Sequence, residues 1–210
     1  MGRYLGSSCK QCRREGIKLM LKGIRCETAK CPVEKRQRNL APGMHGWRRG
    51  RGSEYAVRLR EKQKVKRYYG VFERQFMHCF REASRTKGNT GLTLLQLLER
   101  RLDNVVYKLN FAPSRKTARQ LISHGHIYVN RRKVDVGDYT TKIGDKITVK
   151  ASDRSAKKVR GQLETNPNFT TQSWLQLARE KLEATVVALP TRADVQIPVE
   201  EQLIIEFCSR

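Results

Sequence analysis

Four of the six cysteines in the chain, Cys9, Cys12, Cys26 and Cys31, stand as two close pairs separated by thirteen residues. The pattern C-x2-C followed by C-x4-C is typical of a tetrathiolate metal site, in which each pair lies on a tight turn. One Zn²⁺ is the expected ion, and a four-iron cluster is the alternative, because four thiolates hold either group. Four protein ligands leave no open coordination position, so the pattern predicts a structural centre.

Disulfide bonds are the competing interpretation of these cysteines. The residues after Met1 are polar and basic, with no apolar segment of the kind found in secretory signals. We therefore expect the cytoplasm, a reducing compartment, where metal binding is favoured over disulfides or unused thiols. Cys79 and Cys208 stand apart from the two pairs and are expected to be ordinary buried or half-buried thiols.

Positive charge dominates the composition, with 44 Lys and Arg against 20 Asp and Glu, a net charge of +24 and a pI of about 10.3. Basic and acidic residues number 20 and 5 in residues 1–70, 16 and 7 in 71–150, and 8 and 8 in 151–210. This excess predicts that the first two thirds bind nucleic acid, with an acidic membrane surface as the lesser alternative. A membrane span is excluded, because apolar runs such as Val186–Leu189 are far shorter than the ~20 residues that a spanning helix needs.

A basic arm and a basic helix are the first elements expected to carry this charge. The arm, residues 33–53, is rich in glycine and proline, so it has little to pack and should become ordered on a partner. Ser53 is a good N-cap for a helix over 54–69, in which Tyr55, Val57 and Leu59 are expected to face inward. The cations of the arm and helix that we expect to meet nucleic acid include Arg48, Arg49, Arg51, Arg58, Arg60 and Lys66.

Core helices are expected next. A helix is predicted over 73–86. Its residues Phe76, Phe80 and Ala83, with Phe72 just before it, recur at the spacing of one buried helix face. Two leucine- and valine-rich helices over 93–100 and 102–109 should also be core. Ser114 then caps a helix over 115–124, in which backbone N–H groups and the helix dipole together predict a phosphate site. The outward residues near the start of that helix are Arg115, Lys116, Arg119 and Gln120.

The remaining chain alternates short strands with two helices. Strands are predicted over 127–129, 133–134, 146–150, 174–177 and 185–189. Helices are predicted over 152–164 and 200–207, the second with Leu203, Ile204 and Phe207 on one face. The fold class is therefore α+β: a four-Cys metal knuckle, a mostly helical domain, and a module of helices with a small antiparallel sheet.

Catalytic motifs are missing from the sequence, which contains no phosphate-binding Gly-x4-Gly-Lys loop, no Gly-x-Gly-x-x-Gly and no Gly-x-Ser-x-Gly. His45 lies in the basic arm, where a nucleic-acid contact is expected. His124 and His126 flank Gly125 at a helix end, where capping and binding are both open interpretations. The chain is therefore not expected to be an enzyme.

Three stretches resemble the bacterial family of ribosomal protein S4 of the small subunit. They are MGRYLGSSCKQCRREG with its cysteine spacing, SEYAVRLREKQKVKRYYGVFERQF, and RRLDNVVYKLNFAPSRKTARQLISHGHIYVN followed by GDKITV. The ending VEEQLIIEFCSR also fits, so the likeness covers nearly the whole chain. The third stretch alone is a module that also occurs in tyrosyl-tRNA synthetases, pseudouridine synthases and a heat-shock protein.

The resemblance implies a knuckle and arm over 1–45, a helical domain over 46–97 completed by 190–210, and an S4-type RNA-binding module over 98–189. It implies a structural protein that binds the 5′ domain of 16S rRNA, nucleates assembly of the 30S body, and lies where messenger RNA enters, beside ribosomal proteins three and five. A role in translational accuracy and, in some bacteria, repression of its own operon are also implied. The implied RNA-binding residues, with the cations above, are Arg48, Arg49, Arg51, Tyr55, Arg58, Arg60, Lys62, Gln63, Lys66, Arg67, Arg115, Lys116, Arg119, Gln120, His124 and Asn130.

One departure from the family concerns a hairpin turn, where Arg131 stands after Asn130 in place of the usual glycine. A type I′ turn needs positive φ at both central residues, so another turn type is an open alternative. Two other functions are weighed against the ribosomal one: an accessory of an RNA-modifying enzyme and a zinc-dependent nucleic-acid-binding regulator. The first lacks a catalytic constellation, and the second lacks a recognition helix after the cysteines.

Overall fold

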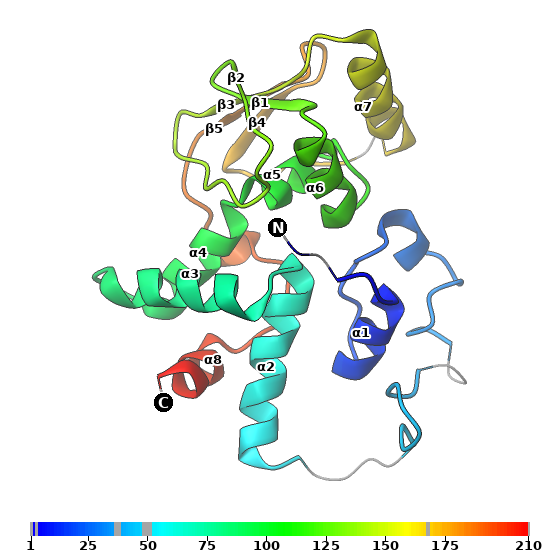
Figure 1. Cartoon of the computed structure of the whole chain (residues 1–210), viewed down its shortest axis with the longest axis vertical. Helices are drawn as coiled ribbons and strands as arrows, with labels where there is room; N and C mark the ends of the chain where they lie inside the picture. Colours follow the sequence, from blue (N-terminus) through cyan, green and yellow to red (C-terminus); the bar gives the residue numbers. More distant parts are fainter. Residues whose placement is uncertain (1, 3, 36–38, 48–51, 167–168, 210) are drawn as a thin grey trace. The chain divides into compact units, whose positions relative to one another are not determined.

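The computed structural model describes residues 2, 4–35, 39–47, 52–166 and 169–209, and Figure 1 traces the chain. It divides into two compact units. The helical unit comprises Met1–Leu94 and Gln196–Arg210, and the sheet unit comprises Leu95–Val195. The helical unit is thus assembled from both ends of the chain, and the sheet unit is inserted between them.

The helical unit begins with a short helix that the cysteine pattern did not predict. Helix α1, Ser8–Glu15, carries Cys9 and Cys12, where we expected a tight turn. Positions three residues apart share one face of a helix, so a helix presents both thiols to the same side as well as a turn would. A 3₁₀ helix, η1, over Gly23–Cys26 carries the third cysteine.

Helix α2, Glu54–Tyr69, is bounded as the sequence predicts: Ser53 Oγ accepts a hydrogen bond from Ala56 N, and Gly70 ends the helix at φ 66°. Helix α3, Glu73–Arg85, buries Phe76, Phe80 and Ala83 as expected. Helix α4 spans Thr90–Glu99, and the C-terminal helix α8 spans Glu201–Cys208. Helices α2 and α8 lie side by side, although residues 70–200 separate them in the sequence (Figure 1).

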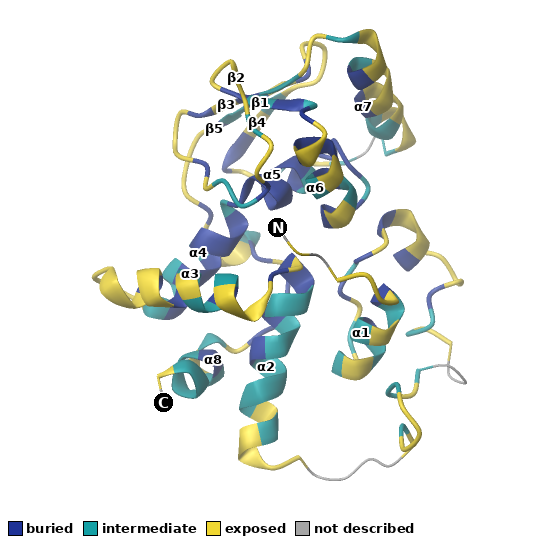
Figure 2. Ribbon diagram, in the orientation of Figure 1, coloured by how far each residue is buried: buried dark blue, intermediate teal, exposed yellow. Residues whose placement is uncertain are grey.

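Three apolar residues predicted to face the core are exposed instead. Tyr55 and Val57 are 60% and 46% exposed, because only the second half of α2, from Lys62 onward, is buried. Phe72 is 44% exposed because it is the N-cap of α3, with an extended backbone, so the helical spacing of the face behind it does not apply. Figure 2 shows the exposed start and buried end of α2.

The sheet unit consists of helices and one antiparallel sheet. Helices α5, Leu102–Lys108, and α6, Arg115–Ser123, precede the sheet, and helix α7 spans Asp153–Thr165. The strands are β1 Ile127–Val129, β2 Arg132–Lys133, β3 Lys146–Val149, β4 Leu175–Ala178 and β5 Glu183–Val186, in the order β2-β1-β3-β5-β4. A 3₁₀ helix, η3 over Arg192–Asp194, lies between β5 and the end of this unit.

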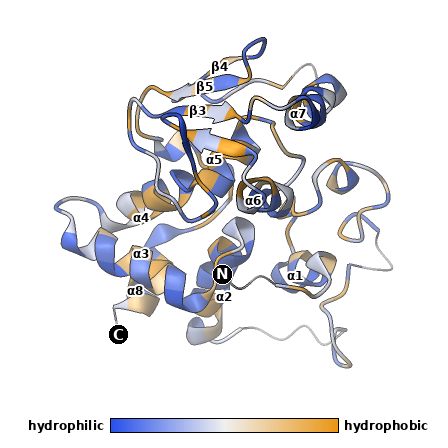
Figure 3. Cartoon of the chain, turned by 45° about the horizontal axis from the view of Figure 1, so that its top comes forward, coloured by the Kyte–Doolittle hydropathy of each residue, from blue (hydrophilic) through white to orange (hydrophobic). Residues whose placement is uncertain are grey.

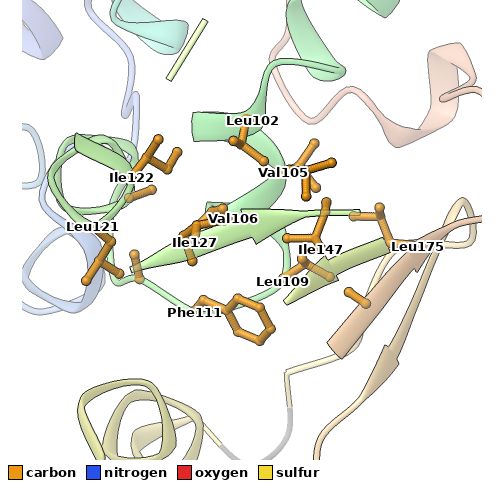
Figure 4. Packing of buried hydrophobic residues seen from close by; sticks show 14 of the residues in the cluster. Leu102, Val105, Val106, Leu109, Phe111, Leu121, Ile122, Ile127, Ile147 and Leu175 are labelled. Atoms are coloured by element: carbon orange, nitrogen blue, oxygen red, sulfur yellow. The ribbon is translucent and has the colours of Figure 1, made fainter. Parts of the chain in front are cut away.

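One apolar core holds this unit together. Leu102, Val105 and Val106 of α5, with Leu109 just after it, pack with Ile127 and Ile147 of the sheet, as Figure 4 shows. Further buried members are Phe111, Leu121, Ile122, Val159, Trp174 and Leu175. The leucine and valine stripe assigned to the core in the sequence is therefore core.

The β1–β2 hairpin turns through Asn130 and Arg131, whose φ angles are 49° and 65°. Both residues therefore lie in the left-handed region that a two-residue type I′ turn requires, so the alternative turn type is wrong. The asparagine side chain supports this strained conformation. Its Oδ1 accepts a hydrogen bond from Lys146 N at 3.0 Å, and its Nδ2 donates one to Asp145 Oδ1 at 2.8 Å.

Among the described residues, no helix is both long enough and apolar enough to cross a bilayer.

The packing of α8 yields a stability prediction. Ile204 is 1% exposed, whereas Leu203 is only half-buried. Ile204→Ala is expected to lower the free energy of unfolding by about 2–5 kcal/mol, because it removes buried methyl groups and leaves a cavity. Leu203→Ala, the matched control, should cost clearly less. Urea unfolding followed by circular dichroism measures both variants, and equal losses would contradict the packing described here.

Candidate functional site

The four paired cysteines line one small pocket in the helical unit, together with Leu21 and Val33. Cys12, Cys26 and Cys31 are buried and Cys9 is half-buried. None of the six cysteines is joined in a disulfide in this structure. Cys79 and Cys208 are half-buried, as expected.

The pocket raises the pKa of two of its thiols. Burial raises the pKa of the Cys12 and Cys26 thiols, and for Cys12 the neighbouring thiols Cys26, Cys9 and Cys31 raise it further. Lys22 N donates a hydrogen bond to Cys26 Sγ at 3.3 Å. Sulfur donors that accept backbone N–H groups suit a soft metal ion.

The thiols nevertheless do not stand at ligand positions. Within the ranges that the structure describes, no three His, Cys, Asp or Glu side chains are grouped so that they could hold a metal ion. The structure thus brings the predicted donors to one pocket and does not arrange them as a tetrahedral centre. The donor set fits zinc in number and chemistry, and its assignment is taken up under the proposed function.

The cations of α2 are all engaged inside the protein. Arg58 Nε lies 2.8 Å from Glu206 Oε2, and its Nη1 lies 3.0 Å from Glu54 Oε2. Lys62 Nζ and Lys66 Nζ reach the two oxygens of Glu73 at 2.7 and 2.5 Å. The remaining pairs are Lys64 with Glu61, and Arg60 and Arg67 with Glu15.

The α2 cations that we expect to bind RNA therefore also form contacts within the protein. Lys62 is buried, with its ammonium 4.5 Å from the centroid of the Phe207 ring, so it serves the contact between α2 and α8. Tyr55 is exposed, with its ring centroid 5.4 Å from that of Phe207, and Gln63 is half-buried. A phosphate that approaches α2 must compete with carboxylates already in place.

Glu15 joins the cysteine pocket to the basic helix. Its side chain is completely shielded from solvent, and its Oε1 is shared by Arg60 and Arg67 of α2. Its Oε2 is buried without a hydrogen-bond partner. Because Glu15 ends the helix that carries Cys9 and Cys12, the orientation of α1 and the position of two α2 arginines depend on each other.

The start of α6 also differs from its prediction. Ser114 caps the helix as expected, and Lys116 and Gln120 are exposed, but Arg115 is buried. Its Nε donates to Asn104 Oδ1 at 2.7 Å, and its guanidinium stacks 4.5 Å from the centroid of the Tyr107 ring. The outward orientation predicted for Arg115 is therefore wrong, because its long side chain folds back across α5.

Arg119 forms an ion pair with a buried carboxylate. Its Nε and Nη2 donate to Asp103 Oδ2 at 3.1 and 2.5 Å, and Arg101 Nη2 contacts the same oxygen at 3.0 Å. The Asp103 side chain is only 2% exposed, so it needs these cations to offset its desolvation. Replacing Arg119 would break this buried network, and replacing Arg115 would break its hydrogen bond to Asn104, so neither change would report phosphate contacts alone.

The remaining predicted contacts lie at the end of α6, in the β1–β2 turn and in the basic arm. His124 is exposed at the end of α6, and His126 Nδ1 lies 2.8 Å from Ser155 Oγ. The amide of Asn130 is occupied in the hairpin, so it has a structural role whatever else it contacts. In the arm, Trp47 is 64% exposed, and Arg48, Arg49 and Arg51 lie outside the described residues.

Sequence reasoning missed a group of cations on and beside α7. Lys150, Arg154, Lys157 and Lys158 are exposed. The net charge of residues 151–210 is zero, so it gave no sign of these cations. Helix α7 itself nevertheless has four basic and two acidic residues. Their spacing at i, i+3 and i+4 from Arg154 was the available signal, since it places three charges on one helix face.

The pairing of Glu15 predicts a pH effect on stability. Burial raises the pKa of its carboxyl above the ordinary 4.5, and Arg67 and Arg60 oppose that shift. The folded chain then binds this proton more tightly than the unfolded chain. Its contribution to stability is therefore complete below pH 4.5 and is lost as the pH rises through the raised pKa.

Glu15→Gln keeps the shape of the side chain and does not titrate. The free energy of unfolding of the wild type, minus that of Glu15→Gln, is expected to fall as the pH increases above 4.5. Urea unfolding of both proteins at stepped pH measures this difference. A difference that stays flat, or that grows with pH, would contradict the burial described for Glu15.

Comparison with known proteins agrees with this architecture. Residues 3–99 match the family described as "Ribosomal protein S4/S9 N-terminal domain", and residues 100–147 match the "S4 domain" family. Over the whole of both chains, the protein is 51%, 52% and 53% identical to the "Small ribosomal subunit protein uS4" of Thermoanaerobacter sp., Thermus thermophilus and Gloeobacter violaceus, respectively. The chain belongs to the uS4 family of small-subunit ribosomal proteins.

Proposed function

We propose that this chain is a structural protein of the small ribosomal subunit that binds 16S rRNA in its 5′ domain and nucleates assembly of the 30S body. The observation that carries the proposal is full-length similarity to uS4 proteins in a chain with a net charge of +24. Its place in the cell is then the ribosome of the cytoplasm. No bond is made or broken in this function.

The physical task is to hold an RNA junction. Where several RNA helices meet, their phosphates repel one another, and this repulsion opposes the folded junction. A protein that neutralises phosphates on more than one helix favours the folded state and releases condensed counterions. Specificity comes from the shape of the junction and from unpaired corners, because the A-form major groove is too narrow to be read.

Three finer roles belong to the same proposal. In the assembled subunit the chain lies beside ribosomal proteins three and five, where messenger RNA enters, and contributes to the accuracy of translation. It also binds the messenger of its own operon and represses its translation. These roles rest on membership of the family and on the exposed cations, and each requires the RNA-binding surface.

The metal assignment is part of the proposal too. Cys9, Cys12, Cys26 and Cys31 would hold one Zn²⁺, which would supply a tetrahedral cross-link between α1 and the segment around η1. Support comes from the pocket that the four thiols share and from the backbone donor on Cys26. A four-iron cluster is the alternative occupant of the same donors.

RNA binding is tested by filter binding against two RNAs over a salt series. The wild type should bind a 5′-domain junction of 16S rRNA far more tightly than a plain RNA duplex, since a duplex engages fewer cationic surfaces at once. The slope of log affinity against log salt should be steep, at about 0.7–0.9 for each phosphate neutralised. Equal affinity for both RNAs would indicate a generic polycation and would overturn the proposal.

Elemental analysis of the purified chain tests the metal. One zinc per chain is expected, or about four irons for the alternative, and Cys26→Ser should lose the metal because the site then has three thiolates. Cys79→Ser is the matched control, since this cysteine lies on α3 and should leave the metal content unchanged. A metal-free wild type with protected amides in α1 would contradict the assignment.

A further inference from the structure

Helix α7 presents a cationic face that none of the predicted RNA contacts includes. Arg154, Lys157 and Lys158 are exposed, whereas Ser155 and Val159 on the opposite side are 3% and 1% exposed. Figure 2 shows α7 exposed on one side and buried on the other, and Figure 3 draws it largely in hydrophilic colours. Lys150, just after β3, adds a fourth exposed cation.

These four side chains differ from the cations of α2 in one decisive respect. Among the described residues, none of the four has an ion-pair or hydrogen-bond partner for its charged group, whereas each of the six α2 cations has a carboxylate within reach. A phosphate that binds a paired cation must displace that carboxylate. A phosphate that binds an unpaired cation displaces only water and counterions, which favours binding.

Three of these four cations, Lys150, Arg154 and Lys158, act electrostatically on His126. Its imidazole is held against α7 by the 2.8 Å contact between Nδ1 and Ser155 Oγ. Burial lowers the pKa of His126 most, and Lys158, His124, Lys150 and Arg154 lower it further. These charged groups come from the end of α6, from the segment after β3 and from α7.

We propose that Lys150, Arg154, Lys157 and Lys158, here called the α7 surface, form a binding site for RNA backbone phosphates, through which the sheet unit grips the rRNA. The inference rests on the proposed function and names a surface for it. A membrane does not fit this surface, because the apolar residues of α7 are packed inward and none is left to enter a bilayer. The site reads charge and spacing, so it contacts the RNA backbone without selecting a base sequence.

The test uses the full chain and the 5′-domain junction RNA in a filter-binding salt series. The triple variant R154Q/K157Q/K158Q removes three charges from exposed positions, so its fold should be retained. The salt slope should fall by about 2, since each phosphate contact contributes roughly 0.7–0.9. Because the two salt lines converge near 1 M, this corresponds to an affinity loss of about a hundredfold at 0.1 M salt.

A charge-matched control isolates the position of the charges. R132Q/K142Q/K146Q removes three exposed cations of the same unit, which lie in β2, before β3 and at the start of β3, at the opposite end of that strand from Lys150. Its slope should stay close to that of the wild type. Equal loss in both variants would mean that only net charge matters, and the α7 surface would be rejected.

A second measurement follows His126 directly, in the wild type and in the triple variant. In the wild type, nuclear magnetic resonance titration of the His126 imidazole should show its pKa rising when the junction RNA binds, because phosphates then offset the cations around it. In the triple variant, RNA should leave that pKa nearly unchanged. An unshifted His126 in the wild-type complex would overturn the inference.

Three outcomes distinguish a failure of this inference from a failure of the proposed function. If the triple variant is folded by circular dichroism and binds RNA with the wild-type slope, the α7 surface fails and RNA binding stands. Polyglutamate serves as a probe for an acidic protein partner. If the triple variant loses the wild-type binding to polyglutamate but keeps the wild-type binding to RNA, the surface binds an acidic protein and the inference is wrong. If the wild type itself shows no salt-dependent binding to the junction, the proposed function fails first.

Discussion

Self-repulsion among 44 basic side chains, opposed by only 20 acidic ones, is the constraint on which the rest of this structure depends. With this excess, there are too few carboxylates to pair with every basic side chain. Some of the described acidic residues lie where elements meet, such as Glu73, Glu15 and Asp103. Each of these accepts two cations, so a few carboxylates stabilise several contacts.

The cations therefore fall into two classes with different work. Those of α2 hold the helical unit together, through Glu206 on α8, Glu73 on α3 and Glu15 on α1. Those of the α7 surface hold nothing in the free protein. A single exposed ion pair adds little to the free energy of unfolding. A cation that is already paired nevertheless binds a phosphate less readily than an unpaired cation does.

Buried charge organises the sheet unit in a similar way. Asp103 is shared by Arg101 and Arg119, and Asn104 joins Arg115 to the backbone and side chain of Glu99. Breaking one partner of such a network is costly, because the other charge is left buried without compensation. The network therefore fixes α6 against α5, and with it the end of α6 where His124 and His126 lie.

Much of the secondary structure was determined by the sequence alone. The boundaries of α2 follow from Ser53 and Gly70, and the buried face of α3 follows from the spacing of Phe76, Phe80 and Ala83. These signals are local, because capping and helical periodicity involve residues within one or two turns. The cysteine spacing likewise indicated one shared site, and the four thiols do line one pocket.

Only the tertiary structure decided which cations are free. In the sequence, Lys62 and Arg115 look no different from Lys157, yet the first two are buried against distant partners and the third is exposed. Arg58 meets Glu206 across 148 positions, and Arg67 meets Glu15 across 52. Charge pairing depends on distance through space, which the order of residues does not fix until the helices have packed.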